Sequence, residues 1–396
     1  MSSTEKITAG YDGQTGKLLK ISLVTSLLTV LTIGIYRFWA KTRIRRFLLS
    51  SISVNGDRFE YTGTGLEKLK GFFIALIVVA VYLSIVQLLL FFFNLSMFRR
   101  VSSEVDFIIM TASFYLNLVF LAPLIFFAQY RARRYKMART RFRGIRFGME
   151  PGAWGYSVRV IGHGLLTLIS LGLLLPRQTY WLEKYQTDRT WYGQVKFHQS
   201  GSWTQLYSAM RHIFIGLGLA LLSGLAMALS KPTLGTIVFV IATIWWSLGV
   251  MYYKVKSFQY LTNTKVLGDE VHFSNNLTPS SIITMVILGS LGASIITLLC
   301  ILLLAGPIGA LIWQSDISTA TLGMLSIMLP PLAYISAFIL IGALMLVMVV
   351  QPVISHIVQH TTVLHLDSLE SINQRAPDLG TDAEGFADVL DVGATV

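Results

Sequence analysis

The stretch RRFLLSSISVNGDRFEYTG, residues 45–63, predicts a small β-hairpin in a chain whose other long segments are apolar. Asn55-Gly56 separates two short runs of alternating character. Asn-Gly is favoured there because a two-residue hairpin turn requires positive φ at both central residues. Five basic residues between positions 37 and 46 precede this hairpin, and the apolar segment 21–36 precedes those residues. The sequence therefore places a basic hairpin directly after a membrane-like segment.

The composition of the chain is typical of a protein that crosses the membrane several times. Of its 396 residues, 54% are hydrophobic and 13% are charged, and the mean hydropathy is +0.62. A soluble globular protein carries about 25% charged residues. The net charge of +12 indicates basic cytoplasmic loops rather than nucleic-acid binding, because Lys and Arg accumulate in such loops. Cys300 is the single cysteine, so no disulfide framework is expected.

The lengths of the uncharged windows indicate how many helices cross the membrane. A spanning helix needs about 20 apolar residues. Windows 21–36 and 160–175 hold 16 residues each and are short, whereas the others are long enough or nearly so. We therefore predict an all-α polytopic membrane protein with about six long transmembrane helices, two short helices and small β-hairpins in cytoplasmic loops. The longer windows are 71–98, 107–130, 212–230, 232–253, 271–315 and 317–366.

The two short windows belong to an internal repeat. LLTVLTIG at 27–34 matches LLTLISLG at 165–172, an offset of 138, and the same offset places Phe59 on Phe197. Internal repeats constrain the whole fold, so they are established before a fold is proposed. The sequence predicts two repeat units with flanking segments. The predicted parts are a cytoplasmic N-terminus (1–20), a first repeat unit (21–147), a second repeat unit (148–273), C-terminal membrane helices (274–366) and an acidic cytoplasmic tail (367–396).

The hairpin recurs more often than the long repeat. A basic residue, an aromatic residue and a Phe 12 positions later occur three times, and LGDEVHF at 267–273 is a looser fourth version. A glycine permits positive φ at each turn. The Phe and its basic neighbour then point to opposite faces of the strand. The predicted hairpin residues are Asn55, Gly56, Phe59, Gly144, Phe147, Gly193, Phe197, Gly268 and Phe273.

The distribution of positive charge favours one topology over another. If all eight windows crossed the membrane, the 32 Lys and Arg would divide 14 against 18 between the two sides. If 21–36 and 160–175 each entered and left on one face, 29 of the 32 would share that side. The positive-inside rule favours this re-entrant arrangement, with both termini cytoplasmic. The alternative is that the two windows are short tilted helices that cross fully.

Several motifs resemble those of a known family. TIGIYRFWAKTRIRRF, NGDRFEYTGTG, TRFRGIRFG and the ending AEGFADVLDVGA are similar to segments of the YjgN family of bacterial inner-membrane proteins. The resemblance covers nearly the whole chain and implies a multi-pass protein of the bacterial inner membrane, but it implies no activity. The second repeat unit has GLLLPRQTYW where the first has GIYRFWAKTR, which removes several positive charges. The two halves therefore need not be interchangeable.

Two function classes fit the sequence. The first is a transporter-like or channel-like protein for a small neutral or anionic solute, because short segments at matching positions of two halves are typical of a solute path. His163 has an alternative role as a polar side chain satisfied near the interface. The uncharged windows hold no Asp, Glu, Lys or Arg, which argues against ion coupling. The candidate path residues are Thr25, Thr29, Thr32, His163, Thr167 and Ser170.

The second class is a structural, anionic-lipid-binding or partner-recruiting membrane protein. Each basic residue near an anionic membrane surface contributes about 1 kcal/mol to its binding. The bilayer, and anionic lipid within it, is then the expected partner, whereas the oligomeric state is open. The predicted contacts to anionic lipid or to the acidic tail are Arg43, Arg45, Arg46, Arg58, Arg131, Arg133, Arg134, Arg146, Lys184 and Lys196.

Signals for catalysis or for a cofactor are weak. The sequence lacks a Gly-rich phosphate loop, a nucleophile elbow and paired carboxylates, so we expect neither an enzyme nor a cofactor. His356 and His360 have the spacing of a helical metal pair, but without a neighbouring carboxylate or thiolate they predict no metal site. Seven of the 20 acidic residues lie in the tail 367–396, which either docks on the basic loops or remains solvated.

Overall fold

The computed structural model describes residues 6–95, 100–314 and 334–376, with the backbone alone for 304–314. Eleven strands occur in these residues, and they form one antiparallel sheet. The strands are β1 (Lys6–Thr8), β2 (Gly10–Tyr11), β3 (Ile52–Val54), β4 (Asp57–Tyr61), β5 (Thr140–Phe142), β6 (Ile145–Met149), β7 (Thr190–Tyr192), β8 (Val195–Gln199), β9 (Lys265–Leu267), β10 (Val271–Asn275) and β11 (Thr361–Leu364).

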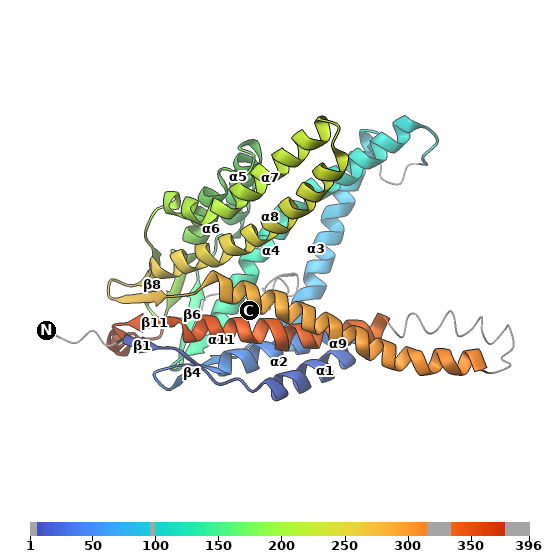
Figure 1. Ribbon diagram of the computed structural model, residues 1–396. Helices are drawn as coiled ribbons and strands as arrows, with labels where there is room; N and C mark the ends of the chain where they lie inside the picture. The colour runs from blue at the N-terminus through green and yellow to red at the C-terminus, as the bar shows by residue number, and fades with distance from the viewer. Residues whose placement is uncertain (1–5, 96–99, 315–333, 377–396) are drawn as a thin grey trace.

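Long helices connect these strands and extend away from the sheet, as Figure 1 shows. The C-terminal helix Tyr334–Gln359 contains a π-helical segment, η2 (Leu346–Val350), and ends as α11 (Gln351–Gln359). The other helices are α1 (Thr15–Leu31), α2 (Arg37–Ser50), α3 (Gly65–Phe92), α4 (Glu104–Arg139), α5 (Ala153–Ile169), α6 (Leu175–Thr187), η1 (Trp203–Met210), α7 (Arg211–Ala228), α8 (Pro232–Asn263), α9 (Pro279–Gln314) and η3 (Leu366–Ser371).

The sheet is a nearly closed barrel. Its strand order is β1-β11-β10-β9-β8-β7-β6-β5-β4-β3-β2, so the two strands at its ends are consecutive in the chain. β1 pairs with β11, β2 pairs with β3, and Ala9 alone separates β1 from β2. The N-terminal segment therefore links the two ends of the sheet, which leaves little free edge for pairing with another chain.

The recurring Phe lies at the seams between neighbouring hairpins. Phe59 lies directly opposite Phe142 on the next hairpin, and Phe147 lies opposite Tyr192. The ring centroids of these two pairs are 4.8 and 4.9 Å apart. Directly opposed aromatic pairs stabilise antiparallel strands by roughly 0.2–1 kcal/mol each. Phe197 opposite Leu267 and Phe273 opposite Val363 continue this arrangement around the barrel.

The predicted all-α class with small separate hairpins is wrong, because the hairpins join into one eleven-stranded sheet within the described residues. An isolated two-stranded hairpin is marginally stable, whereas a sheet with a shared apolar face is stable. The barrel encloses such a face, with Val54, Phe142, Tyr192 and Leu267 buried inside it. The sequence signal for each hairpin is local, whereas the pairing between hairpins joins segments tens of residues apart.

Each helix pair begins and ends at the sheet. β2 precedes α1 and β3 follows α2, and β2 pairs with β3. The same holds for α3–α4 between β4 and β5, for α5–α6 between β6 and β7, and for α7–α8 between β8 and β9. β10 and β11 likewise pair at the ends of α9 and the C-terminal helix. All four tight hairpin turns in the described chain therefore lie at the other end of the strands.

The two short windows form helical hairpins with the same geometry. At the tip of the first, Ile33 and Gly34 have φ of 50° and 87°. At the tip of the second, Leu171 and Gly172 have φ of 52° and 89°. The amide of Gly34 donates to the Thr29 carbonyl at 2.7 Å, and that of Gly172 donates to the Thr167 carbonyl at the same distance. Both hairpins therefore return the chain to the sheet.

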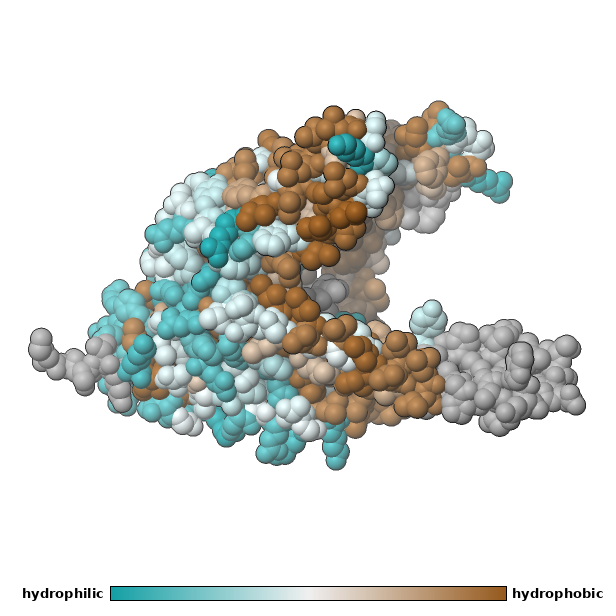
Figure 2. Space-filling model, in the orientation of Figure 1, coloured by the Kyte–Doolittle hydropathy of each residue, from teal (hydrophilic) through white to brown (hydrophobic). Residues whose placement is uncertain are grey.

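The surface confirms an integral membrane protein. Six helices in the described chain are long and apolar enough to span a bilayer, which confirms the predicted number of long spans. Figure 2 shows hydrophobic residues over the helices and hydrophilic residues over the sheet end. Many large apolar side chains are exposed along the helices, such as Phe92 at 80% exposure. Soluble monomeric proteins rarely expose so large an apolar surface to water. The spans are α3, α4, η1 with α7, α8, α9 to Leu303, and Tyr334–Gln359.

Candidate functional site

A cavity of about 620 Å³ lies between α1, α2 and the C-terminal helix. It has the size of a small-molecule site, which is typically about 300–1,000 Å³. One wall is basic, one carries hydroxyl groups and one is apolar. The lining includes Ser22, Thr25, Ser26, Thr29, Arg37, Lys41, Ile44, Arg45, Phe338, Ile341, Gly342, Met345, Leu346 and Val350. We call this space the basic cavity.

A row of cations on α2 forms the basic wall. Arg37, Lys41 and Arg45 are spaced four residues apart, so they lie on one face of the helix. Arg37 is exposed, Lys41 is half-buried and Arg45 is 6% exposed, so the row runs from the surface into the protein. The Arg45 guanidinium donates to the Tyr61 hydroxyl at 3.3 Å, which anchors the inner end of the row.

Two of the hydroxyl groups that α1 contributes to the cavity are already used as donors within their own helix. Thr25 donates to the Ile21 carbonyl at 2.8 Å, and Thr29 donates to the Thr25 carbonyl at 2.7 Å. A hydroxyl has one proton to donate, so these groups offer lone pairs to a ligand. Thr32 lies outside the described lining and accepts from the Tyr36 amide at 2.8 Å. An anion in the basic cavity would therefore find its charged donors on α2.

The apolar wall depends on how α9 packs against the C-terminal helix. A Cβ at Gly289 would lie 2.3 Å from the Met348 carbonyl oxygen, so glycine permits a close approach there. Met348 belongs to the π-helical segment η2, and such segments are frequent at functional sites. Gly342, one turn closer to the helix tips, has nothing within 4 Å of a Cβ. The C-terminal helix is thus held tightly near the sheet and faces open space further out.

In the second repeat unit, neighbouring elements engage two of the three equivalent positions. The residues at the offset of 138 from Arg37, Lys41 and Arg45 are Leu175, Thr179 and Glu183. The Tyr253 hydroxyl, from α8, donates to the Thr179 hydroxyl at 2.8 Å. The cation row is therefore present in the first unit and replaced in the second.

The Glu183 carboxylate joins three elements. It accepts from Arg133 of α4 at 2.9 Å and lies 3.2 Å from the ammonium group of Lys265 of β9. Burial alone would raise the pKa of Glu183, but Arg133 and Lys265 outweigh burial and hold the pKa well below its usual range. Arg133, predicted to contact lipid or the tail, is thus engaged in an internal ion pair.

The predicted path residues of the second unit lie apart from the basic cavity. His163 lies 3.2 Å from the Arg177 guanidinium, Thr167 donates to Gln178 at 2.9 Å, and Ser170 accepts from the Leu174 amide at 3.0 Å. The described lining of the basic cavity contains Thr25 and Thr29 but not these three residues. The structure therefore does not bring the two predicted halves of the path into one cavity there.

Three of the residues predicted to contact lipid or the acidic tail also brace the hairpins. Arg46, Arg134 and Lys184 each donate to the carbonyl of the residue 15 positions later, the last residue of the hairpin. The distances are 3.3 Å to Tyr61, 2.8 Å to Met149 and 2.6 Å to Gln199. The recurring basic residue therefore ties the end of a helix to the end of the hairpin that follows it.

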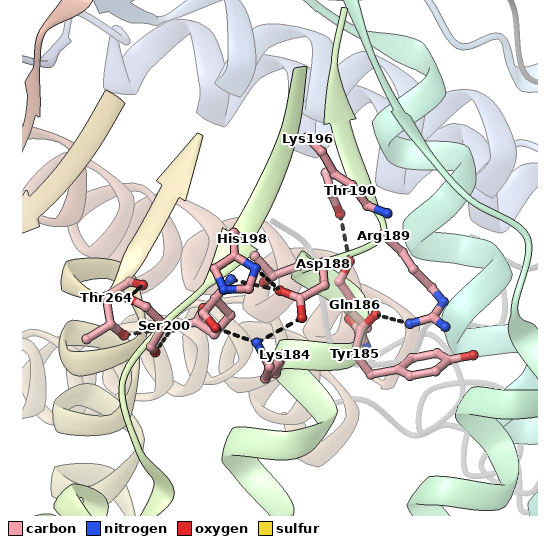
Figure 3. Close-up of polar contacts among 12 residues, drawn as sticks. Lys184, Tyr185, Gln186, Asp188, Arg189, Thr190, Lys196, His198, Ser200 and Thr264 are labelled. Carbon is pink, nitrogen blue, oxygen red and sulfur yellow. Dashed lines mark hydrogen bonds and ion pairs between the residues drawn. The ribbon is translucent and has the colours of Figure 1, made fainter. Parts of the chain in front are cut away.

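Figure 3 shows this brace at the third hairpin. The Lys184 ammonium group forms an ion pair with Asp188 at 2.9 Å. The Asp188 carboxylate also accepts from the backbone amide of Gln199 at 2.8 Å. His198 lies 3.5 Å from Asp188, and Ser200 donates to the Thr264 carbonyl at 2.7 Å. These contacts link α6, β8 and α8, so the cluster holds neighbouring units together.

The remaining predicted basic contacts lie on or near the surface. Arg58 pairs with Asp12, and Lys196 pairs with Glu150 at 2.9 Å. The Arg146 amide donates to the Gln374 side chain at 2.7 Å. Arg43 lies over the ring of Tyr36, and Arg131 lies over that of Phe127. The acidic tail beyond residue 376 lies outside the described residues.

A family model described as "Bacterial protein of unknown function (DUF898)" matches residues 7–301. The chain belongs to this DUF898 family. The match includes the whole of α1 and α2, and therefore two of the three walls of the basic cavity. The C-terminal helix, which forms the third wall, lies beyond the matched residues.

Named relatives in the family are inner membrane proteins, which confirms the resemblance to YjgN. "Inner membrane protein YjgN" of Escherichia coli O157:H7 is 29% identical over 174 residues, 41% of this chain and 38% of the relative. The protein of the same name from Salmonella typhimurium is 34% identical over 80 residues, 20% of each chain. The match thus spans less than two fifths of the length of the E. coli relative. No solved structure matches the chain.

Proposed function

We propose that this integral membrane protein binds an anionic ligand in the basic cavity. The observation that carries the proposal is the difference between equivalent residues of α2 in the first repeat unit and α6 in the second. Lys41 of the first unit lines an open cavity, whereas Thr179 of the second is engaged by Tyr253. Arg45 of the first lines the same cavity, whereas Glu183 of the second is neutralised by Arg133 and Lys265. The positions of Lys41 and Arg45 thus border an open space in the first half, whereas their equivalents contact α4, α8 and β9 in the second.

The chemistry of the walls supports an anion over a cation. Three cations line one space, and the Thr25 and Thr29 hydroxyls, whose protons are used within α1, add lone pairs. A cation placed there would be repelled by α2, whereas phosphate or carboxylate oxygens would accept charge-assisted hydrogen bonds, which are about twice as strong as neutral ones.

Transport of a small neutral or anionic solute is the second candidate function. It is favoured by the position of the basic cavity beside α1, one of two short helices at matching positions of the two halves. Binding of an anion without transport is favoured by the lining, because the described residues of the basic cavity come from the first repeat unit and the C-terminal helix, and none comes from the second repeat unit. We therefore take anion binding as the primary function and transport as an additional step.

The test is a calorimetric titration of the detergent-purified full chain with inorganic phosphate at constant ionic strength. Lys41→Gln should weaken binding about fivefold, and Arg37→Gln with Lys41→Gln about 30-fold, because each charge contributes about 1 kcal/mol. Arg43→Gln is the matched control, since Arg43 is on the same helix but outside the described lining. Equal weakening by Arg43→Gln and Lys41→Gln would contradict the proposal. Phosphate flux into proteoliposomes that Lys41→Gln reduces about fivefold at subsaturating phosphate would establish transport.

A further inference from the structure

A second, apolar cavity adjoins the basic cavity. It has a volume of about 640 Å³ and lies between α1, α9 and the C-terminal helix. Val30, Phe338 and Ile341 line both cavities, so the two spaces share a wall. Its remaining lining residues are Ser294, Thr297, Leu298, Ile301, Tyr334, Ile335 and Ala337. We call this space the apolar cavity.

The apolar cavity offers little to a polar ligand. The Thr297 hydroxyl, one of its few polar groups, donates to the Ala293 carbonyl at 2.8 Å. Phe338 and Tyr334 at its rim are 70% and 78% exposed, so the cavity opens at the side of a membrane-spanning helix. A spanning helix is surrounded by lipid tails, so an acyl chain has direct access to this opening.

The two cavities together have the polarity of a lipid. The apolar cavity lies toward the helix tips, whereas the cations of α2 extend from there toward the sheet, ending at the buried Arg45. We propose that the anionic ligand is an amphiphile, with a phosphate-type headgroup beside Lys41 and an acyl chain in the apolar cavity. This inference rests on the proposed anion-binding function and specifies its ligand class.

The other half of the repeat provides an internal comparison. A cavity of about 480 Å³ lies between the α5–α6 tip, α7 and α8, and it is lined by apolar residues such as Leu171, Ala220 and Trp246. Leu175, at the position equivalent to Arg37, also lines it. This cavity has space for a chain but no cation row among its described lining residues. It should therefore accept apolar chains without selecting an anionic head.

The test uses water-soluble monoalkyl phosphates rather than bilayer lipids. A chain that moves from a bilayer into the protein gains little hydrophobic free energy, so its length would hardly change the measured affinity. The full chain is held in amphipol and titrated with inorganic, butyl, hexyl and octyl phosphate. Affinity should rise about fourfold for each methylene that enters the apolar cavity. Inorganic phosphate and octyl phosphate of equal affinity would show that the ligand is a free anion, which overturns this inference but leaves the proposed function standing.

Two variants test whether the acyl chain occupies the apolar cavity. Ala337→Phe places a ring in the apolar cavity without touching α2, so it should flatten the dependence on chain length and leave inorganic phosphate binding unchanged. Ala220→Phe is the matched control, because it fills the cavity between α7 and α8 and should leave the dependence intact. Lys41→Gln should weaken all four ligands by the same factor. An unchanged chain-length dependence in Ala337→Phe, or equal flattening in Ala220→Phe, would overturn the inference.

Discussion

Glu183 and Arg45 show how one residue decides the role of a repeated element. They occupy equivalent positions in the two units, near the ends of α6 and α2. The carboxylate of Glu183 draws Arg133 and Lys265 together and closes the packing around it. The guanidinium of Arg45 cannot attract those cations, and it faces the basic cavity instead. A change of sign at a single position therefore accompanies an internal ion-pair cluster in one unit and a cation-lined cavity in the other.

Replacing Glu183 should destabilise the fold in a pH-dependent way. Glu183→Gln should lower the free energy of unfolding at pH 7 by about 1–3 kcal/mol, because it leaves the half-buried Arg133 and Lys265 without their carboxylate. The pKa of Glu183 is lowered in the fold, so its contribution is present above the unfolded pKa of about 4.3 and is lost as pH falls through the folded value. Thermal melting should show the two proteins converging under acid conditions. A constant difference from pH 7 down to pH 3 would contradict this role.

The turn at Gly56 tests the backbone requirement of the first hairpin. Asn55 and Gly56 have φ of 51° and 84°, and a Cβ at Gly56 would meet no atom within 4 Å. Gly56→Val should therefore destabilise through backbone strain alone, by about 1–3 kcal/mol. Gly56→Asn should cost less, because Asn tolerates positive φ. Equal melting temperatures for the Val and Asn variants would show that the turn does not require this conformation.

The basic braces explain why helix and hairpin recur as one unit. Each joins the last turns of a helix to the carbonyl of the last hairpin residue, as Lys184 does with Gln199. A cation can reach that carbonyl at a fixed spacing, which is why the basic residue and the Phe keep a constant separation in the sequence. The basic residues that the sequence suggests as lipid contacts therefore also have hydrogen-bond acceptors within the protein.

The brace can be separated from ordinary surface charge with two lysine variants. Lys184→Met should lower the free energy of unfolding by about 1.5–3 kcal/mol, because it removes a charge-assisted hydrogen bond and an ion pair with Asp188. Lys196→Met removes an exposed pair with Glu150 and should cost at most about 1 kcal/mol. Chemical or thermal denaturation measures both. Similar losses in the two variants would argue against a bracing role for Lys184.

Local signals in the sequence predicted elements well and their assembly poorly. The Asn55-Gly56 turn and the apolar runs follow from nearest neighbours, so the hairpins and the long spans were found. β1, β2 and β11 have two to four residues each and no turn signal, and only their partners in the barrel stabilise them. The pairing of Phe59 with Phe142 joins segments 83 positions apart, which no local pattern encodes.

The candidate site was predicted in part. Thr25 and Thr29 were expected to line a polar space, and they line the basic cavity. Arg37 and Lys41 were missed, although the spacing of Arg37, Lys41 and Arg45 on one helix face was a signal that could have identified the cation row. The apolar wall could not be predicted, because it depends on the packing of α9 against a helix some fifty residues further along the chain.

At the scale of the whole molecule, the barrel organises the membrane helices. Each described helix pair leaves the same end of the sheet and returns to it. These helices therefore all lie at one end of the barrel, and the tight hairpin turns lie at the other. Figures 1 and 2 show the helices diverging from a hydrophilic base and carrying the hydrophobic surface away from it. We therefore predict that the membrane normal runs from the sheet toward the helix tips. From the positive-inside rule we also predict that the sheet end, which carries most of the positive charge, faces the cytoplasm.

Cysteine accessibility tests this arrangement most directly. In a Cys300→Ser background, single cysteines replace the exposed residues Glu60, Gln194 and Asp269 on three hairpins, and Val101 and Lys231 at helix tips. A membrane-impermeant thiol reagent should label Val101→Cys and Lys231→Cys in intact cells. It should label the three hairpin cysteines only after permeabilisation. If the hairpin cysteines divided between the two sides, so that Glu60→Cys were labelled in intact cells and Gln194→Cys were not, a single barrel at one membrane face would be contradicted.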